Sequence, residues 1–533
     1  MIETGARLLV EGLLRAGIKH LFSLSGNQIM PIYDALIGRD IDLIHTRHEA
    51  AAVHIADAWG RLTEQPGVAL LAAGPGHCNA VSALYVALMA ESPLVMLSGH
   101  APLSQLGRGA FQEIDQVATV QPVTKAAWLV EDAARLDDDF GKAFELAQSG
   151  RPGPVHLSLP QDILTAEISA SADSADQTPN GALISQQTIV AILTHLASAQ
   201  RPLILAGPAM ARPQRWAGIA HLSAVTGIPA LPIDSPRGVN DPWLHGAANA
   251  LAQADVVLLV GKKIDFSLRF GQPPLFGRTC RFIQIEAESS QLNHSEQVVL
   301  QMQADPAAAI RQLSQAAQGR AWPQTAWKDQ VAAARMATPP EWEALRQSAR
   351  RPIHPLRVCA ALQPFLDAGG IFISDGGEFG QWMQAGLEAD TRLINGPSGS
   401  IGSALPMGLA AKLAHPERPV FITMGDGTFG FHAMEIDTAV RCHLPIIVIT
   451  GNDARWNAEH QIQVRDYGPE RAIGCQLRPT RYDKMVEALG GYGELVQSPD
   501  DLSPALERAV ASGLPACLNV MIDGLAAPTF EAG

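Results

Sequence analysis

A strand–helix–strand pattern between residues 420 and 455 constrains the fold of this chain more than any other feature. Two apolar runs, at residues 420–424 and 445–450, flank a helical pattern that extends to about His443. The first run breaks at a Gly-Asp-Gly turn around Asp426, and the second at a Gly-Asn-Asp turn that ends in Asp453. In a parallel α/β unit, both breaks fall at the carboxyl ends of strands, where such sheets bind ligands. The pattern therefore predicts a parallel sheet with both aspartates at one edge.

The chemistry of these turns suits one kind of ligand. Gly425 and Gly427 leave backbone N–H groups accessible, and Thr428 follows in the first turn of the expected helix. Exposed N–H groups at a helix N-terminus favour a diphosphate, and two carboxylates supply the oxygen ligands that Mg²⁺ prefers. The alternative is that Gly-Asp-Gly is only a tight turn and that Asp453 caps a surface loop. The second break at this spacing favours the ligand site.

The rest of the chain predicts three α/β domains. A chain of 533 residues is too long for one core, and apolar runs alternate with helical patterns throughout. We expect doubly wound parallel sheets in residues 1–165, 185–335 and 352–533. The linkers between them are a small, polar segment at about 166–184 and a proline-containing segment at about 338–355.

Composition excludes several classes of partner. A net charge of −14 argues against nucleic acid as an electrostatic partner. Apolar runs stay below the roughly 18 residues of a membrane span, and the first residues lack the basic region of a signal peptide. Six scattered cysteines without a Cys-x-x-Cys pair suit free thiols in a reducing compartment. We expect a cytoplasmic protein that acts on a small molecule.

The turns at Asp426 and Asp453 resemble the fingerprint of thiamine-diphosphate enzymes, and their surroundings resemble the acetolactate synthase-like branch. The resemblance implies thiamine diphosphate and Mg²⁺ as cofactors, with domains in pyrimidine-binding, central and diphosphate-binding order. It places Asp426, Asp453 and the main-chain carbonyl of Arg455 on the metal. This chain has Asp453 where the family pattern has an amide, and Mg²⁺ accepts a carboxylate readily.

Glu49 lies in the segment Thr-Arg-His-Glu-Ala-Ala-Ala, which is similar to the family segment that carries an activating glutamate. Thiamine's C2 is a very weak carbon acid, so the cofactor's own 4′-amino group must become basic enough to accept that proton. In the family, a buried carboxyl hydrogen-bonded to the pyrimidine N1′ favours the required tautomer. The alternative is that Glu49 only complements a helix dipole. The next predicted helix of the same domain carries Asn79, which we also expect at the cofactor.

Further cofactor contacts are implied in the third domain. The resemblance places diphosphate-contacting groups at residues 377–381, beginning with Gly377, on the turn that follows the apolar run 370–374. The loop 396–402 is similar to the one that holds the aminopyrimidine. There Gly399 accepts from the 4′-amino group and Ile401 wedges beneath the bent cofactor, although an isoleucine between glycines also fits a plain core position.

The substrate is implied by segments outside the cofactor motifs. Phe-Gln-Glu at residues 111–113 resembles acetolactate synthases and 2-hydroxyacyl-CoA lyases, with Gln112 contacting substrate; the alternative is a loop that packs its aromatic ring. Glu459 and His460 are acid–base candidates. The region 456–463 departs from acetolactate synthases, and the motifs are most similar to bacterial 2-hydroxyacyl-CoA lyases.

The resemblance therefore implies a C–C lyase or carboligase, favoured as an enzyme that splits a 2-hydroxyacyl-CoA into formyl-CoA and an aldehyde or ketone, or joins them. The alternatives are an acetolactate synthase-type carboligase or decarboxylase acting on free 2-oxo acids, and a relative without catalysis. Relatives form sites between subunits, which implies a homodimer or homotetramer. They also place FAD or an ADP moiety on the central domain, where Lys262, Lys263 and Arg269 either meet CoA phosphates or form a solvated face.

Overall fold

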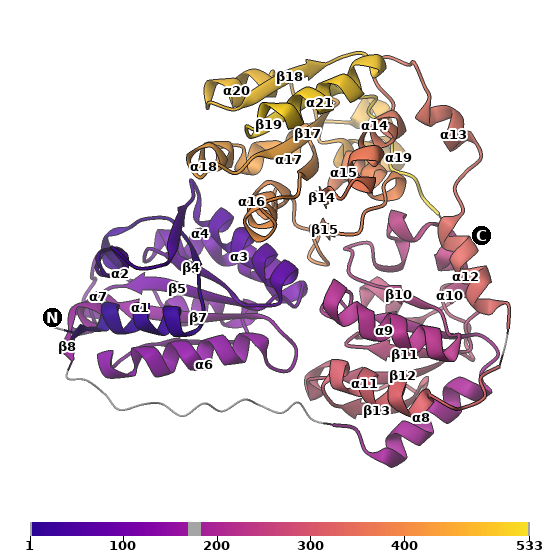
Figure 1. The fold of residues 1–533 in the computed structure, drawn as a ribbon, viewed down its shortest axis with the longest axis horizontal. Coiled ribbons are helices and arrows are strands. Elements are labelled where there is room, and N and C mark those ends of the chain that lie inside the picture. The colour runs from indigo at the N-terminus through magenta and orange to yellow at the C-terminus, as the bar shows by residue number, and fades with distance from the viewer. Residues whose placement is uncertain (1–2, 169–182, 324, 531–533) are drawn as a thin grey trace.

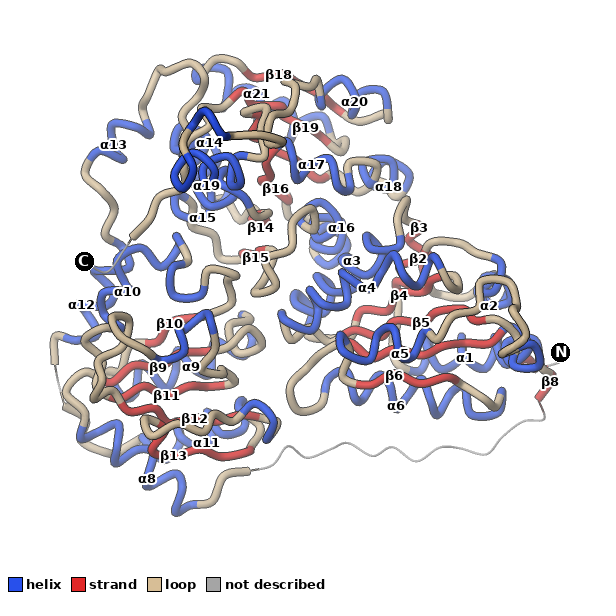
Figure 2. The backbone as a smooth tube through the Cα atoms, turned by 180° about the vertical axis from the view of Figure 1, so that it is seen from behind, coloured by secondary structure: helices blue, strands red, loops and turns tan. Residues whose placement is uncertain are grey.

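The computed structural model describes residues 3–168, 183–323 and 325–530. It contains three parallel sheets, one in each predicted domain, with helices packed on both faces (Figures 1 and 2). The predicted α/β class with three doubly wound domains is confirmed. Residues 169–182 of the first predicted linker lie outside the described residues.

The first domain holds a six-stranded sheet in the order β3-β2-β4-β5-β7-β6. Its strands are β2 (His20–Ser23), β3 (Asp42–His45), β4 (Gly67–Leu71), β5 (Leu94–His100), β6 (Ala126–Leu129) and β7 (Pro154–Pro160). Its helices are α1 (Gly5–Arg15), α2 (Met30–Leu36), α3 (Glu49–Thr63), α4 (Pro75–Met89), α5 (Gln116–Val120), α6 (Leu136–Gln148) and α7 (Gln161–Thr165). The short strands β1 (Glu3–Thr4) and β8 (Glu167–Ile168) pair antiparallel and join the two ends of the domain.

The central domain holds a five-stranded sheet in the order β10-β9-β11-β12-β13. Its strands are β9 (Pro202–Ala206), β10 (Ala230–Pro232), β11 (Val256–Val260), β12 (Arg281–Glu286) and β13 (Val298–Gln303). Its helices are α8 (Gln186–Ser198), α9 (Pro213–Thr226), α10 (Ala248–Leu251), α11 (Pro306–Ala317) and α12 (Trp327–Met336).

The third domain holds a six-stranded sheet in the order β15-β14-β16-β17-β19-β18. Its strands are β14 (Ile371–Ser374), β15 (Arg392–Ile394), β16 (Val420–Gly425), β17 (Ile446–Asn452), β18 (Tyr492–Val496) and β19 (Ala516–Met521). Its helices are α14 (Pro355–Asp367), α15 (Gly377–Gly386), α16 (Ala404–Ala414), α17 (Asp426–His432), α18 (Glu435–Arg441), α19 (Asn457–Tyr467), α20 (Tyr482–Ala488) and α21 (Leu502–Ser512). Counted along the chain, the first and third sheets have the same order of strands: second, first, third, fourth, sixth, fifth.

Two local expectations differ from the structure. The helical pattern after Asp426 forms two short helices, α17 and α18, because the chain turns at residues 433–434 between them. The second predicted linker contains a helix, α13 (Glu341–Arg346), whose Trp342 packs into the core of the third domain. A buried tryptophan thus stabilises helical structure in a segment that is polar and rich in proline.

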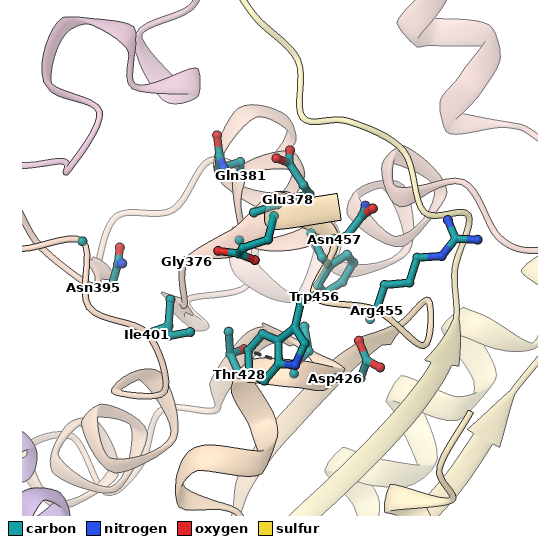
Figure 3. A pocket seen from close by; sticks show the side chains of 18 of the residues that line it. Gly376, Glu378, Gln381, Asn395, Ile401, Asp426, Thr428, Arg455, Trp456 and Asn457 are labelled. Carbon is teal, nitrogen blue, oxygen red and sulfur yellow. Dashed lines mark hydrogen bonds between the residues drawn. The ribbon is translucent and has the colours of Figure 1, made fainter. Parts of the chain in front are cut away.

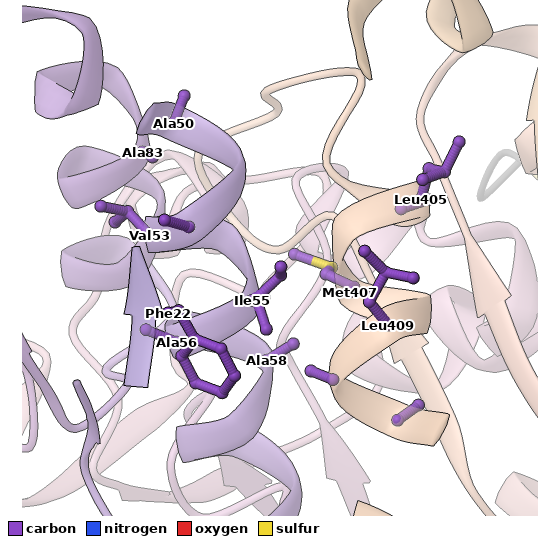
Figure 4. Close-up of a cluster of buried hydrophobic side chains, with 14 of the residues drawn as sticks. Phe22, Ala50, Val53, Ile55, Ala56, Ala58, Ala83, Leu405, Met407 and Leu409 are labelled. Carbon is purple, nitrogen blue, oxygen red and sulfur yellow. The ribbon is translucent and has the colours of Figure 1, made fainter. Parts of the chain in front are cut away.

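The first and third domains share one hydrophobic core. Helix α3 packs against α16, and the two contribute small and aliphatic side chains such as Ile55, Ala58, Met407 and Leu409 (Figure 4). These side chains are almost wholly buried, and each large one contributes about 1.5–3 kcal/mol relative to an exposed position. The loops that precede α3 and α16, which the sequence predicts to contact the cofactor, are therefore attached to a rigid interface.

Candidate functional site

A cavity lies at the carboxyl edge of the third sheet, where β14, β16 and β17 end (Figure 3). Its lining comes from the turns after these strands, the loop 395–401, the start of α19 and one segment of the central domain. The lining residues are Ser235, Pro236, Arg237, Gly376, Gly377, Glu378, Phe379, Gln381, Gln384, Asn395, Gly399, Ile401, Gly425, Asp426, Gly427, Thr428, Gly451, Asp453, Arg455, Trp456, Asn457, Ala458 and Glu459. The predicted cofactor and metal residues of the third domain, together with Glu459, thus line one cavity.

Asp426 and Asp453 form an acidic pair in this cavity. They follow Gly425 and Gly451–Asn452 on neighbouring parallel strands, where Gly425 is in register with Gly451. Burial and the charge of Asp453 raise the pKa of Asp426, and burial raises the pKa of Asp453 against the opposing charge of Arg455. Oδ2 of Asp426 is buried and has no hydrogen-bond partner among the described residues. Two close carboxylates are stabilised either by a proton on one of them or by a bound cation, and the unsatisfied oxygen of this pair fits Mg²⁺.

The loop that follows Asp453 is held in a strained conformation. Ala454 has a positive φ of 56°, and the loop pairs antiparallel with residues 475–477. Trp456 N donates to Cys475 O and Leu477 N donates to Ala454 O, each at 2.7 Å. These bonds use the carbonyl of Ala454 and the N–H of Trp456, on either side of Arg455, and the Arg455 carbonyl has no main-chain donor in the described chain. Its position in the cavity lining fits the predicted metal contact.

Glycines leave open space along this cavity. A Cβ on Gly377, which has a φ of +83°, or on Gly425 would have open space around it. Gly427 differs, since a Cβ there would lie 2.7 Å from the Trp456 ring. The Thr428 hydroxyl donates to Gly425 O at 3.0 Å, which fixes the turn. Gly399, with a φ of +70°, and Ile401 also line the cavity.

Asp375 organises the site, and the sequence reasoning did not single it out. This fully buried carboxylate accepts from the N–H groups of Gly376 at 2.8 Å and of Gly402 and Ala404 at 3.0 Å. Burial raises its pKa to about 6, and these three N–H groups favour the charged form against that effect. An acidic residue at the end of a buried strand, directly before two glycines, was the signal that could have identified it.

The acid–base candidates of α19 separate in the structure. Glu459 lines the cavity, with Trp456 and Asn457 beside it. His460 is not among the lining residues, and its Nδ1 is buried without a hydrogen-bond partner in the described chain. The geometry therefore favours Glu459 over His460 as a group that reaches a bound substrate.

The candidates of the first domain form a separate cluster at the carboxyl edge of their own sheet. Glu49 begins α3 and accepts from Asn79 Nδ2 at 3.0 Å. Gln112, in a left-handed conformation with a φ of 59°, accepts from Gln28 Nε2 at 2.9 Å. None of these residues lines the cavity of the third domain. Glu49 is half-buried in this chain, whereas the sequence predicted a buried carboxyl.

A second cavity, of about 520 Å³, lies mainly on the central domain. Its charged lining residues are Glu91, Arg151, Lys262, Lys263, Asp265 and Glu286. Lys262 is buried and forms an ion pair with Asp265 at 2.7 Å, and Arg151 pairs with Glu91 at 2.9 Å. Arg269, predicted with the two lysines, is not among the lining residues. Ser235 lines both this cavity and the first one, so the two adjoin.

Comparisons with known proteins match this architecture along most of the chain. Three family models of the thiamine pyrophosphate enzymes match: the N-terminal TPP binding domain at residues 3–119, the central domain at 189–313 and the C-terminal TPP binding domain at 375–520. A search of the described helices finds none with the length and apolar character to cross a membrane.

Individual relatives align over nearly their whole length. An acetolactate synthase large subunit of Mycobacterium tuberculosis is 36% identical, with 97% of this chain and 95% of the relative covered. A 2-hydroxyacyl-CoA lyase of Oryza sativa is 30% identical with the same coverage, and one of Arabidopsis thaliana is 29% identical over 98% of this chain and 96% of the relative. The chain therefore belongs to the thiamine-diphosphate-dependent enzymes, in the branch that contains acetolactate synthases and 2-hydroxyacyl-CoA lyases.

Proposed function

We propose that this enzyme is a thiamine-diphosphate- and Mg²⁺-dependent C–C lyase and carboligase that acts reversibly on 2-hydroxyacyl-CoA thioesters. Its products in the cleavage direction are formyl-CoA and an aldehyde or ketone. The second cavity is the observation that supports a CoA thioester as substrate, because it adjoins the cavity of the third domain at Ser235. A long substrate with a nucleotide end and a reactive end fits two adjoining cavities.

The residues of the third domain fit the diphosphate and its metal. Asp426, Asp453 and the Arg455 carbonyl are the proposed Mg²⁺ ligands, and Gly377, Gly425, Gly427 and Thr428 line the diphosphate side. Gly399 and Ile401 are the proposed contacts of the aminopyrimidine. When bound, thiamine diphosphate supplies a carbon nucleophile and an electron sink for breaking or forming a C–C bond.

The residues of the first domain have the complementary task. We propose that the Glu49 carboxyl holds a proton toward the pyrimidine ring, that Asn79 orients this carboxyl, and that Gln112 contacts a substrate oxygen. Because these residues do not line the cavity of their own chain, the proposal requires a second subunit that apposes the two halves, as in a homodimer or homotetramer. It assigns residues 1–165 to the pyrimidine, 352–533 to the diphosphate and 185–335 to the nucleotide end of the substrate.

The chemistry of the second cavity supports a nucleotide. Lys263 offers positive charge to phosphates, whereas Lys262 is already paired with Asp265 and Arg151 with Glu91. Glu286 ends β12, a position from which carboxylates in such folds accept hydrogen bonds from ribose hydroxyls. Burial raises the pKa of Glu286 to about 8, and hydroxyl donors would favour its charged form. The same features suit FAD or ADP, so the proposal expects a free nucleotide to compete with CoA for binding in this cavity.

The alternative is a carboligase or decarboxylase that uses free 2-oxo acids. It is favoured by the 36% identity with the acetolactate synthase subunit, compared with 30% for the lyase of Oryza sativa. In that case, the second cavity has no role in substrate binding and holds a resident nucleotide or none.

The deciding experiment is turnover of the purified protein with thiamine diphosphate and Mg²⁺ in two arms. One arm contains formyl-CoA with a small aldehyde or ketone, and the other contains pyruvate alone. We expect a 2-hydroxyacyl-CoA in the first arm, with a higher KM for formyl-CoA in Lys263→Gln and unchanged kinetics in the control Lys328→Gln, a position outside the cavity. If pyruvate gives acetolactate, acetoin or acetaldehyde and the first arm gives no product, the enzyme acts on free 2-oxo acids and the CoA proposal is wrong.

A further inference from the structure

A third cavity, of about 270 Å³, lies where all three domains meet. Arg61, Leu62 and Ala90 line it from the first domain. Pro208, residues 211–214 and Asp234 line it from the central domain, and residues 391–394, Gly396, Pro397 and His415 from the third. It borders the second cavity at Pro208 and Pro397 but shares no described lining residue with the first cavity, at the carboxyl edge of the third sheet. The proposed reaction gives this cavity no role.

One of the three arginines that line this cavity forms no ion pair in the described chain. Arg61 is paired with Asp57 and also donates to Ile394 O at 2.8 Å, and Arg392 is paired with Asp241 at 3.0 Å. Arg212 has no ion-pair partner among the described residues, and the nearby carboxylates of Glu91 and Glu64 pair with Arg151 and Arg215 instead. Asp234 is the one carboxylate among the described lining residues, and burial raises its pKa.

Arg212 is also short of hydrogen-bond partners. It is 5% exposed, and its Nη2 donates to the main-chain oxygens of Ala90 and Glu91. Its Nε and Nη1 are buried and have no hydrogen-bond partner among the described residues. Burial and neighbouring arginines lower its pKa to about 10. A buried guanidinium that lacks both a counter-charge and partners for its donors is costly, and an anion would correct both deficits.

The backbone beside Arg212 offers further donors. Arg212 is the N-cap of α9, a 14-residue helix that starts at Pro213 and has no side-chain cap. The first free N–H groups therefore belong to Gln214 and Arg215, and Gln214 lines the cavity. A helix N-terminus next to a guanidinium is a favourable setting for phosphate.

We propose that this junction binds a phosphoryl oxyanion, as inorganic phosphate or as the phosphate group of a small ester, with Arg212 and the N-terminus of α9 as its main contacts. Such a ligand touches all three domains at once. It also lies beside Ile394, whose carbonyl accepts a hydrogen bond from Arg61. Ile394 directly precedes the loop that carries Gly399 and Ile401. Bound phosphate would therefore stabilise the assembled three-domain arrangement around that loop.

The test is calorimetric titration of inorganic phosphate into protein saturated with thiamine diphosphate and Mg²⁺, so that the cofactor site is filled. We expect one phosphate per chain, with affinity weakened about tenfold or more in Arg212→Gln and kept in the control Lys263→Gln, which removes a charge from the second cavity. Arg212→Lys, which keeps the charge but has fewer donors, should weaken binding less than Arg212→Gln.

The control ligands decide the chemistry. Glycerol 3-phosphate tighter than phosphate would identify a phosphate ester as the natural ligand, and the reverse would identify phosphate itself. Acetate binding as tightly as phosphate would overturn the phosphoryl assignment. No phosphate binding by wild-type protein, or equal binding by Arg212→Gln, would overturn the site. The experiment measures no turnover, so its failure is distinct from a failure of the proposed reaction.

Discussion

The absence of a side chain at Gly427 leaves room for the Trp456 ring, which lies in the loop after Asp453. A Cβ at this position would lie 2.7 Å from the Trp456 ring, and that ring is attached to the loop that carries Asp453 and Arg455. We expect Gly427→Ala to destabilise the protein by about 1–3 kcal/mol through overpacking and to weaken binding of thiamine diphosphate. Gly430→Ala is the matched control, since it lies in the same helix and a Cβ there meets nothing within 4 Å. Chemical denaturation and cofactor titration measure both effects, and equal behaviour of the two variants would refute the contact.

Glu49 tests the proposed proton-holding group. We expect Glu49→Ala to abolish turnover and to leave binding of the diphosphate largely intact, because Glu49 does not line the diphosphate cavity of its chain. Product formation and cofactor affinity are measured on the same preparation, with Glu131→Ala, at an exposed position, as control. Wild-type turnover in Glu49→Ala would show that the role assigned to this carboxyl is wrong.

Asp426 tests the metal pair. Asp426→Ala removes one proposed ligand together with a carboxyl whose pKa is raised by burial and by the charge of Asp453. We therefore expect weaker Mg²⁺ binding together with unchanged or higher stability of the metal-free protein. Isothermal titration with Mg²⁺ in the presence of thiamine diphosphate, and unfolding in EDTA, measure the two quantities. A variant that keeps wild-type Mg²⁺ affinity would exclude Asp426 as a ligand.

At the scale of elements, Asp375 connects the end of β14 and the start of α15 with the loop that leads into α16. Asp375→Asn keeps the shape of the side chain but presents an amide donor to three N–H groups. We expect a loss of about 2 kcal/mol in stability and a higher Kd for thiamine diphosphate, because this loop carries Gly399 and Ile401. Asp367→Asn, an exposed change on α14, is the control. Unaltered cofactor affinity in Asp375→Asn would show that the loop holds its conformation without this carboxylate.

At the scale of the whole molecule, buried histidines at the contact of the first and third domains make stability depend on pH. His54 on α3 and His432 on α17 have ring centroids 5.6 Å apart, and both Nδ1 atoms lack hydrogen-bond partners in the described chain. Burial lowers the pKa of each to about 3, below the ordinary value of 6.5. Each is therefore neutral when folded and takes up a proton on unfolding, so its stabilising contribution is complete above pH 6.5 and decreases as the pH falls toward 3.

The expected size follows from linkage. Between pH 7 and pH 5, each of these histidines should cost the folded state about 2 kcal/mol. In His432→Gln, the difference from wild type in the free energy of unfolding should therefore become smaller by about that amount on acidification. His195→Gln, at an exposed position on α8, should show no such change. A constant difference for His432→Gln across this pH range would contradict the buried, neutral state of the pair.

The local pattern predicted the parts of the site that follow directly from strand ends. Asp426 and Asp453 come immediately after buried strands and Gly377 follows in the turn after β14, and a parallel sheet gathers all such positions at one edge. The pattern did not reveal the hydrogen bonds from Asp375 to the loop before α16 or the Gly427–Trp456 contact, because each depends on segments that are distant in the sequence. It also grouped Arg269 with Lys262 and Lys263, although the structure places it outside the cavity, since proximity along a loop does not fix where side chains point.

The sequence by itself determined the α/β class, the three parallel-sheet units and the glycine-containing turns at Asp426 and Asp453. Periodicity and glycine placement act over a few residues, so they can be recognised in the sequence. Only the tertiary structure decided which turns share a cavity and that the second cavity adjoins the first at Ser235. It also decided that Nε and Nη1 of Arg212 lack partners among the described residues where three domains meet. These features arise from how separate domains pack against one another. The physical reason is that burial, charge balance and hydrogen-bond satisfaction depend on neighbours in space, which short-range patterns in the chain do not encode.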